Sequence, residues 1–318
     1  MAIVNRNACV LVTGVLSILY KDTKMIKNIK YILPNIRSMF YLFFYSLRKY
    51  KSKTISGIIF SKDRPIQLDA LLRSYYLYCE NPCSLTVLYN TSDESFQKGY
   101  DELKIIYDSV KFIKENDFRR DLISQLSNID AEFIFFAVDD MIFIRRFSLS
   151  EILSRMSSRV IFSMRLGSRI NWCETCQKEM NPIFTIRDTL LEWKWALNEY
   201  DWAYRFSVDG NVYKTKEILA LTKSFSFKAP NSYEGLMNGF LLFKYKKRGL
   251  SFHDPVVTNL VLNKIQSELE YDNLFGEISV TGLLDYWNQG YQFDIEKISE
   301  YNFNSVHKIT NQIPLVIR

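Results

Sequence analysis

Histidine is almost missing from this chain of 318 residues, which has only His253 and His307. Two histidines exclude a His-rich zinc site and a multi-histidine oxygenase centre. Glycine and proline are scarce, at 11 and 7 residues, so collagen-like and linker-rich architectures are excluded. No GxxxxGKS/T or GxGxxG motif occurs, which disfavours a Walker-type nucleotidase and a GxGxxG-type dinucleotide enzyme. The content of 47% hydrophobic and 24% charged residues instead indicates a globular protein.

Cysteine is also infrequent, with five residues in all. An odd number in a chain of this length is not typical of a secreted disulfide framework, so we expect a reducing compartment. Two close pairs, Cys79 with Cys83 and Cys173 with Cys176, leave a four-thiolate zinc site open if they meet in space. Unligated thiols are the interpretation that we favour.

Positive charge is concentrated in residues 1–53, which hold ten Lys or Arg and a single acid, Asp22. The remainder carries 31 basic and 34 acidic residues and is nearly neutral. A neutral body has little attraction for a phosphate backbone, so no nucleic-acid partner is expected. We therefore divide the chain into a basic arm, 1–53, and a body, 54–318.

The arm combines this charge with apolar side chains. Its apolar run from Ala8 to Tyr20 is 13 residues long, too short to cross a bilayer, and it lacks the flanks of a cleaved signal peptide. The aromatic and basic segment after it suits the surface of an anionic membrane. Packing of a helix on the body is the alternative, and Pro34 is expected to break or kink the segment. These features predict a cytoplasmic protein, with the inner face of the cell membrane as a further expectation.

The body alternates short apolar runs with amphipathic stretches, a pattern typical of an α/β fold. The run Phe133–Val138 is apolar without alternation, which indicates a strand buried on both faces of a parallel sheet. After Asp140 the pattern is less regular. The strands expected are 55–60, 85–89, 111–114, 133–138 and 159–166, and the helices are 65–79, 93–110, 117–129, 148–157, 214–223 and 232–246. We also expect hairpin-like pieces around 183–186 and 204–213. The expected architecture is one Rossmann-like domain, with a mostly parallel sheet flanked by helices.

Polar residues follow each of the first four predicted strands. They are Ser61 to Arg64, Asn90 to Asp93, Glu115 to Asp117, and Asp139 with Asp140. Ligands bind beyond the carboxyl ends of strands in an open parallel sheet, so we expect these groups to form one site. The Asp139–Asp140 pair is costly because its charges repel, and Mn²⁺ or Mg²⁺ would relieve the repulsion. The alternative is a solvated turn. The metal hypothesis requires that the pair lie at a cleft and not be locked to internal arginines.

Four segments, in this order, resemble the GT-A-fold glycosyltransferases, close to the bacterial family-2-like enzymes. They are FSKDRPIQLDALLRSY, FFAVDDMIF, RFSVDGNVYKTKEI and PNSYEGLMN. The resemblance spans roughly residues 54–310 and implies a GT-A-like fold that binds a nucleotide-diphosphate sugar, with a UDP-sugar expected. The segment FSKDRPIQLDALLRSY is similar to the start of a donor site, and FFAVDDMIF resembles a DxD-type metal motif. Met141 stands where a third acid would be, which leaves open which aspartate binds metal.

The resemblance also implies roles for single residues. The nucleotide would be contacted by Ser61, Arg64, Asn90 or Thr91, Arg119 and Asp139, and the metal by Asp140 and the C-terminal His307. Glu234 is our choice for the general base, with Asp209 as the competitor. We expect Glu234 in the first turn of its helix, where the helix dipole alone already favours an acid. Trp172 or Trp202 would stack on the acceptor sugar, with core packing as the alternative.

These expectations predict an inverting, metal-dependent glycosyltransferase acting on a glycan or lipid-linked glycan in bacterial surface polysaccharide synthesis. Two alternatives stay open. A sugar nucleotidyltransferase would share the sheet and the carboxylates, although the segment SKDRPIQ has none of the glycines expected after its first strand. A non-catalytic GT-A-like subunit would bind glycans or partner proteins through the aromatic residues and the arm.

Overall fold

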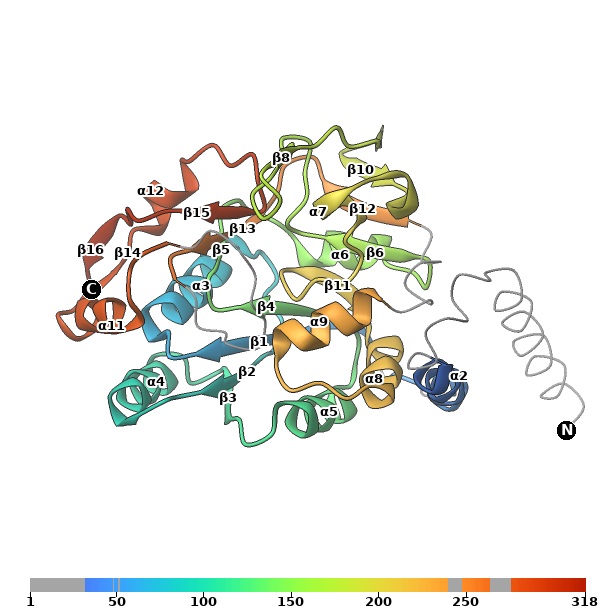
Figure 1. Cartoon of the computed structure of the whole chain (residues 1–318), viewed down its shortest axis with the longest axis horizontal. Coiled ribbons are helices and arrows are strands. Elements are labelled where there is room, and N and C mark those ends of the chain that lie inside the picture. Colours follow the sequence, from blue (N-terminus) through green and yellow to red (C-terminus); the bar gives the residue numbers. More distant parts are fainter. Residues whose placement is uncertain (1–31, 48, 51, 240–247, 264–275) are drawn as a thin grey trace, which may run out of the picture.

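The computed structural model describes residues 32–47, 49–50, 52–239, 248–263 and 276–318 (Figure 1). The predicted apolar run from Ala8 to Tyr20 lies outside these residues. In the described part of the chain, no helix has both the length and the apolar character needed to span a membrane.

Helices and strands alternate along the chain, as the sequence pattern predicts. The helices are α2 Ile32–Ser46, α3 Pro65–Tyr78, α4 Glu94–Ile106, α5 Phe118–Asn128, α6 Leu149–Arg155, η2 Trp195–Leu197, α7 Tyr200–Ala203, α8 Thr215–Ser224, α9 Pro230–Asn238, α11 Val280–Asn288 and α12 Ile295–Ser299. The nine strands of the main sheet are β1 Ser52–Lys62, β2 Leu85–Asn90, β3 Lys111–Lys114, β4 Ala131–Val138, β6 Val160–Ser163, β9 Thr185–Arg187, β10 Leu190–Trp193, β11 Asn211–Lys214 and β12 Arg248–Phe252. Smaller sheets are formed by β5 Met141–Phe143, β7 Trp172–Cys173, β8 Lys178–Glu179, β13 Val257–Val261, β14 Tyr291–Phe293, β15 His307–Ile309 and β16 Leu315–Ile317.

The main sheet has the strand order β3-β2-β1-β4-β11-β6-β12-β10-β9. Strands β3, β2, β1 and β4 pair in parallel, and β6 pairs in parallel with β12. Strand β11 is antiparallel to both β4 and β6, so β6 points in the same direction as β4. The predicted α/β class, with a mostly parallel sheet flanked by helices, is confirmed.

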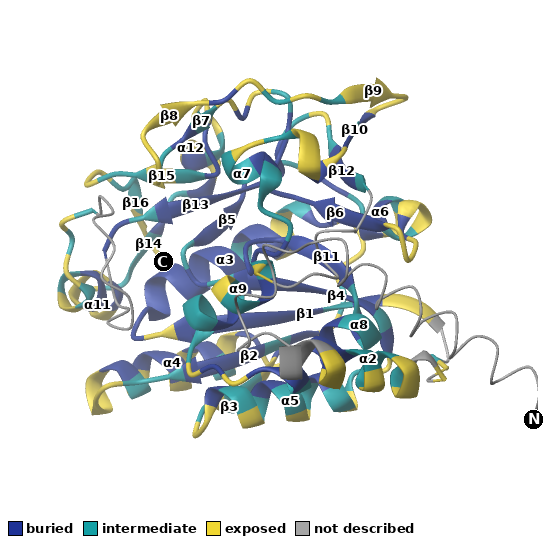
Figure 2. Ribbon diagram, turned by 45° about the vertical axis from the view of Figure 1, so that its right-hand side comes forward, coloured by how far each residue is buried: buried dark blue, intermediate teal, exposed yellow. Residues whose placement is uncertain are grey.

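Helices cover both faces of the sheet, and β4 shows why (Figure 2). Along this strand Phe133, Phe135 and Ala137 enter a core cluster shared with α3, α4 and α11. Ile134 and Phe136 point the other way, into a second cluster shared with α5, α8 and α9. Because side chains alternate along a strand, an unbroken apolar run must have apolar partners on both faces.

Several elements of the second half differ from the sequence prediction. The hairpin-like piece expected around 204–213 instead ends in β11, a central antiparallel strand of the main sheet. Helix α9 begins at Pro230 rather than at Ser232, and it ends at Asn238, whereas the predicted helix continued to about residue 246. Proline is favoured in the first turn of a helix because backbone N–H groups there have no acceptor within the helix, so the lack of an N–H costs nothing.

Helix α2 belongs to the predicted arm and lies beside α8 (Figure 1). Pro34 falls within the first turn of α2 and does not break it, since the first turn tolerates proline. The body-packing alternative for the arm is therefore correct for this helix. The division at residue 53 stays a prediction.

Gly57 supplies a test of the packing between the sheet and its first core. A Cβ atom at this position would lie 2.5 Å from Leu85 Cδ2 and 2.6 Å from Phe135 Cζ. We expect Gly57→Ala to lower the free energy of unfolding in urea by about 1–3 kcal/mol, because the core has no room for the methyl group. In the matched control, Gly235→Ala, the new Cβ meets none of the described atoms within 4 Å, and stability should hold or rise. Equal losses in both variants would contradict the packing argument.

Candidate functional site

Polar residues meet in a cleft of about 750 Å³ at the carboxyl edge of the main sheet. Strands β1 to β4 are parallel, so their carboxyl ends lie at this edge. Strand β11 lies between β4 and β6 and is antiparallel to both, so β6 also ends at this edge. The sequence-predicted residues that line the cleft are Ser61, Arg64, Asn90, Asp139, Asp140, Asp209, Glu234 and His307. Residues from the first strand and from the C-terminal tail are thus brought to one site.

Asp139 is buried and held by the protein itself. Its Oδ1 lies 2.9 Å from Arg64 Nη1, and its Oδ2 accepts hydrogen bonds from Ser61 Oγ at 3.0 Å and the Lys62 backbone N–H at 2.9 Å. Arg64 Nε and Nη2 donate to Asn263 Oδ1. Asp139 is therefore paired with an internal arginine, and its predicted contact with the nucleotide stays a prediction. Asp140 is the acid of the pair that is left for the predicted metal role.

Asp140 keeps a path to the cleft, with 16% of its side chain exposed. Burial raises its pKa to about 6; Arg64, with Nη1 3.6 Å from Oδ2, opposes this, and Asp139 and Asp209 add to it. Asn259 Nδ2 donates to Asp140 Oδ1 at 3.0 Å. A carboxyl group that is costly to ionise is one that a cation would stabilise.

The surroundings of Asp140 fit a hard divalent cation in part. Asn259 Oδ1 is a buried acceptor with no hydrogen-bond partner among the described residues, and it lies on the amide that contacts Asp140. Across the described ranges, no three His, Cys, Asp or Glu side chains are grouped as a metal site. Mg²⁺ often takes only one or two protein carboxylates and completes its shell with water and substrate phosphates. Asp140 and Asn259 match such a sparse set.

Glu234 faces the cleft from α9. Its Oε1 accepts a hydrogen bond from the Val208 backbone N–H at 2.9 Å. Burial raises its pKa to about 7, and the nearby Asp209 adds to the shift. Because α9 begins at Pro230, Glu234 lies beyond the first turn, and the prediction that placed it there is wrong. The helix dipole therefore does not by itself account for this acid.

Asp209 precedes β11 and lies next to His307 from the C-terminal tail. His307 Nε2 is 3.6 Å from Asp209 Oδ2, and Ser207 Oγ donates to the same carboxylate oxygen at 3.1 Å. Burial works to raise the pKa of Asp209, but His307, Arg165 and Ser207 together hold it below its ordinary value. For His307, burial works to lower the pKa, and Asp209 raises it instead. The two form a charge-stabilised pair within the cleft.

Sequence reasoning missed Arg165, which lines the cleft just beyond β6. Only 1% of its side chain is exposed, and its Nη1 lies 3.4 Å from Asp201 Oδ1. The predicted strand 159–166 placed this arginine inside a strand, whereas β6 ends at Ser163. Arg165 could have been found by the rule applied to the first four strands, which looks for a polar side chain directly after an apolar run. Asn259 and Asn263 were also missed, since a single amide in sequence has no distinguishing pattern.

Two predicted nucleotide ligands lie outside the cleft lining. Arg119 Nε and Nη2 donate to the backbone carbonyls of Phe225 and Lys223, at 2.5 and 3.0 Å. Arg119 thus ties α5 to the end of α8, which corrects its predicted contact with the base. Thr91 Oγ1 donates to Gln97 Oε1 at 3.4 Å, so of the Asn90 and Thr91 alternatives only Asn90 lines the cleft.

The predicted acceptor platform is not supported for Trp202. Its side chain is fully buried, packs edge-to-face on Trp193 with ring centroids 4.9 Å apart, and donates from Nε1 to the Ile170 carbonyl at 2.9 Å. Core packing, the alternative weighed for it, is correct. Trp172 is half-buried, and its Nε1 donates to Glu174 Oε2 at 2.8 Å. Glu174 lines the cleft and Trp172 does not, so Trp172 stays beside the site rather than in it.

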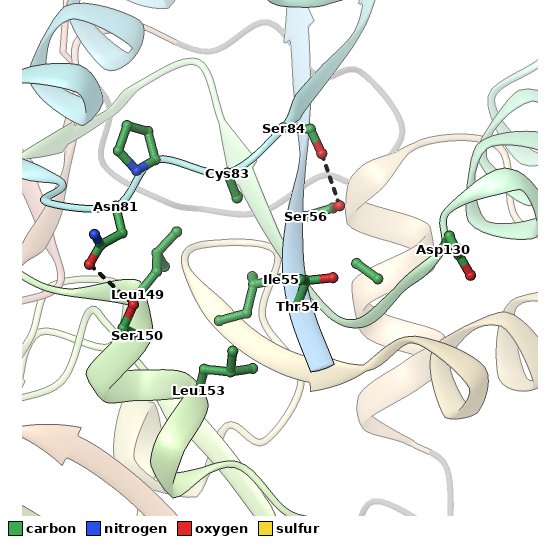
Figure 3. A pocket seen from close by; sticks show the side chains of 12 residues that line it. Thr54, Ile55, Ser56, Asn81, Cys83, Ser84, Asp130, Leu149, Ser150 and Leu153 are labelled. Carbon is green, nitrogen blue, oxygen red and sulfur yellow. Dashed lines mark hydrogen bonds between the residues drawn. The ribbon is translucent and has the colours of Figure 1, made fainter. Parts of the chain in front are cut away.

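The two cysteine pairs belong to different regions. Cys173 and Cys176 line the cleft, whereas Cys83 lines a separate pocket of about 490 Å³ near the start of β1 (Figure 3). Because the two pairs lie at different pockets, they cannot share one metal ion, which removes the four-thiolate alternative. These four cysteines form no disulfide. In the second pocket, Ser56 Oγ and Ser84 Oγ lie 3.1 Å apart. The side chains that line this pocket near β1 are mostly neutral. The cleft at the carboxyl edge of the main sheet is therefore the candidate active site.

Comparisons with known proteins agree with the resemblance found in the motifs. No protein-family model matches the chain. Over 301 residues it is 26% identical to the bifunctional glycosyltransferase pgtA of Dictyostelium discoideum, in a match covering 81% of this chain and 39% of that protein. The chain thus spans about two fifths of the length of this curated relative. The resemblance to a glycosyltransferase is confirmed at this level.

Solved structures give partial likenesses. TarS of S. aureus is 15% identical, with 64% of this chain and 36% of that chain covered and a TM-score of 0.41. The mannosyltransferase PcManGT from Pyrobaculum calidifontis, in complex with GDP-Man and Mn²⁺, is 8% identical, with 46% of each chain covered and a TM-score of 0.29.

Substitution of Arg64 tests whether its charge is what stabilises the adjacent acids Asp139 and Asp140 in the fold. We expect Arg64→Met to lower the free energy of unfolding at neutral pH by about 3–5 kcal/mol, because it leaves Asp139 buried without a partner. The loss should shrink as the pH falls through about 6, because Asp140, whose pKa burial raises to about 6, takes up a proton and no longer needs the missing guanidinium. Urea unfolding at several pH values measures both effects.

The matched control is Arg120→Met, which removes the exposed pair with Asp121 at 3.4 Å. Exposed pairs contribute about 0–1 kcal/mol, so this variant should stay near the parent. Similar losses of unfolding free energy in the two variants would show that the buried Arg64–Asp139 pair contributes no more to stability than an exposed pair.

Proposed function

We propose that the chain is a glycosyltransferase that takes a sugar from a nucleotide-diphosphate donor, a UDP-sugar in the first instance, and transfers it with inversion. The observation that carries the proposal is the single cleft in which Asp140 and Glu234 meet. The curated relative's name supports the same class of reaction. A transferase of this kind needs one group near the leaving diphosphate and another near the attacking hydroxyl, and these two acids supply the two positions.

Glu234 takes the proton of the acceptor hydroxyl in this mechanism. The oxygen then attacks the anomeric carbon of the donor, and the nucleoside diphosphate leaves from the opposite side. A base with a pKa of about 7 is well matched to this task, since it is partly ionised at neutral pH and still basic enough to accept a proton. Ionisation rises with pH, so transfer should rise with pH through this value. Asp209 is held ionised by His307 and is the weaker base of the two.

The donor would lie along the carboxyl ends of β1 and β2. Ser61 and Asn90 line this part of the cleft, and Asp139 fixes Ser61 by accepting its hydroxyl hydrogen. A bound Mn²⁺ or Mg²⁺, held by Asp140 and the Asn259 amide oxygen, would neutralise charge on the diphosphate. His307 is turned toward Asp209, so its part as a metal or diphosphate ligand stays a prediction.

The acceptor proposed is a glycan or lipid-linked glycan used in bacterial surface polysaccharide synthesis, at the cytoplasmic face of the membrane. The basic and aromatic arm supports this choice. The cleft is also lined by Glu174 and Tyr204, polar side chains suited to sugar hydroxyls, and Tyr204 lies near Glu234.

Glu234→Gln tests the catalytic half of the proposal. We expect at least a ~100-fold fall in transfer, because the amide cannot accept the proton, with donor affinity within a few-fold of the parent. Sugar transfer from a panel of radiolabelled nucleotide sugars and isothermal titration with the nucleoside diphosphate give the two readouts. Normal turnover would remove Glu234 from the mechanism.

The matched control is Glu94→Gln, an exposed acid in the first turn of α4, which should leave both readouts unchanged. Release of pyrophosphate from a nucleoside triphosphate and a sugar phosphate would instead favour the nucleotidyltransferase alternative. Nucleotide binding with no turnover on any donor would favour the non-catalytic subunit.

Asp140→Asn tests the donor half. In the parent, Mn²⁺ should raise the affinity for UDP or GDP at least tenfold, and this gain should disappear in the variant. Thermal shift and titration with and without Mn²⁺ measure it. Asp101→Asn, an exposed acid on α4 with 55% of its side chain in solvent, is the matched control. A variant at Asp140 that keeps the full Mn²⁺ effect would contradict the proposed metal ligand.

A further inference from the structure

Helix α2 has two different faces. On one, Ser38 is fully buried and Tyr45 packs against the second core cluster, where its hydroxyl receives a hydrogen bond from Lys223 Nζ of α8. Lys223 also lies 5.1 Å from the centre of the Tyr45 ring. These contacts fix α2 to the body of the protein.

The other face exposes large apolar side chains. Ile36, Phe40, Phe44 and Leu47 are 57%, 68%, 60% and 71% exposed. Their spacing of four, four and three residues places them in one stripe along the helix. Scattered single apolar residues are ordinary on a protein surface, but a continuous apolar stripe on a helix that is already anchored indicates a binding surface. We call these four residues the α2 stripe.

Charge identifies the occupant. Helix α2 contains no acidic residue, Arg37 and Lys49 beside the stripe are exposed, and residues 1–53 carry ten basic residues against one acid. A partner for this region must be apolar at the centre and negative around it. A second copy would bring two basic arms together in a symmetric contact, which like-charge repulsion opposes. A bilayer with anionic headgroups supplies both properties.

We infer that the α2 stripe inserts into the boundary between headgroups and acyl chains of an anionic membrane. At 15 residues, α2 is about 22 Å long, shorter than the hydrocarbon core, so it lies in the plane of the surface rather than across it. Phe and Leu are typical of the apolar face of a helix that lies at this depth. The membrane and body-packing interpretations of the arm thus describe two faces of one helix, with α8 on one side and lipid on the other.

This placement connects the membrane with the candidate active site. Helix α2 packs on α8, and the segment after α8 leads within a few residues into α9, which carries Glu234 (Figure 1). Lys228, Ala229 and Pro230 of that connection line the cleft. The surface inferred here would hold the cleft near an acceptor embedded in the bilayer. Membrane binding itself does not depend on the proposed sugar transfer.

The test is co-sedimentation of the full chain with vesicles of phosphatidylcholine alone and of phosphatidylcholine with phosphatidylserine. We expect binding to the anionic vesicles, weakened by salt, and at least a tenfold loss in the double variant Phe40→Glu, Phe44→Glu. The matched control is Ile105→Glu, Ile106→Glu on α4, where the side chains are 81% and 52% exposed; it should bind within twofold of the parent. Unchanged circular dichroism and thermal unfolding show that each variant is folded.

Three results would overturn the inference. The first is a parent chain that does not bind anionic vesicles, and the second is a stripe variant that binds them as well as the parent does. The third is a dimer in sedimentation equilibrium that the stripe variant abolishes and the control variant does not, which would assign this face to a second copy of the chain. Failure of the proposed function is separate. Vesicle binding that requires the stripe, together with no sugar transfer from any donor, would leave this inference standing and remove the transferase.

Discussion

The buried ion pair between Arg64 and Asp139 is the interaction on which the rest of the site depends. Two adjacent acids after a buried strand are costly, and a guanidinium 2.9 Å from Asp139 offsets that cost. Asn263, contacted by the same guanidinium, brings the segment after β13 to the end of β1. The pairing therefore closes one wall of the cleft and leaves Asp140 as the acid that faces it.

The remaining carboxylates differ because their neighbours differ. Asp209 has His307 beside it and stays ionised, whereas burial, together with the negative charge of Asp209, raises the pKa of Glu234 to about 7. Arg165 lines the same cleft with one nitrogen toward Asp201. One cleft thus holds an ionised acid and an acid near its titration point, the separation of roles that acid–base chemistry uses.

The first half of the molecule was the more predictable half. Strands β1 to β4 and helices α3 to α5 have local patterns, such as the apolar run of β4 and Pro65 at the start of α3, that fix type and approximate bounds. Arg119 shows the limit of the method. It follows the third strand as a nucleotide ligand would, yet its guanidinium caps the end of α8, and only the packing of α5 against α8 decides this.

The sequence by itself determined the α/β class and the edge of the sheet where polar residues gather. Each follows from periodicity or from residue type at the end of a strand, which are local properties. Tertiary structure alone decided that Asp139 pairs with Arg64, that Trp202 belongs to the core, and that Arg165 and Asn259 line the cleft. These facts depend on contacts between residues tens to hundreds of positions apart, and no local pattern records which distant side chain will fill the space beside a given one.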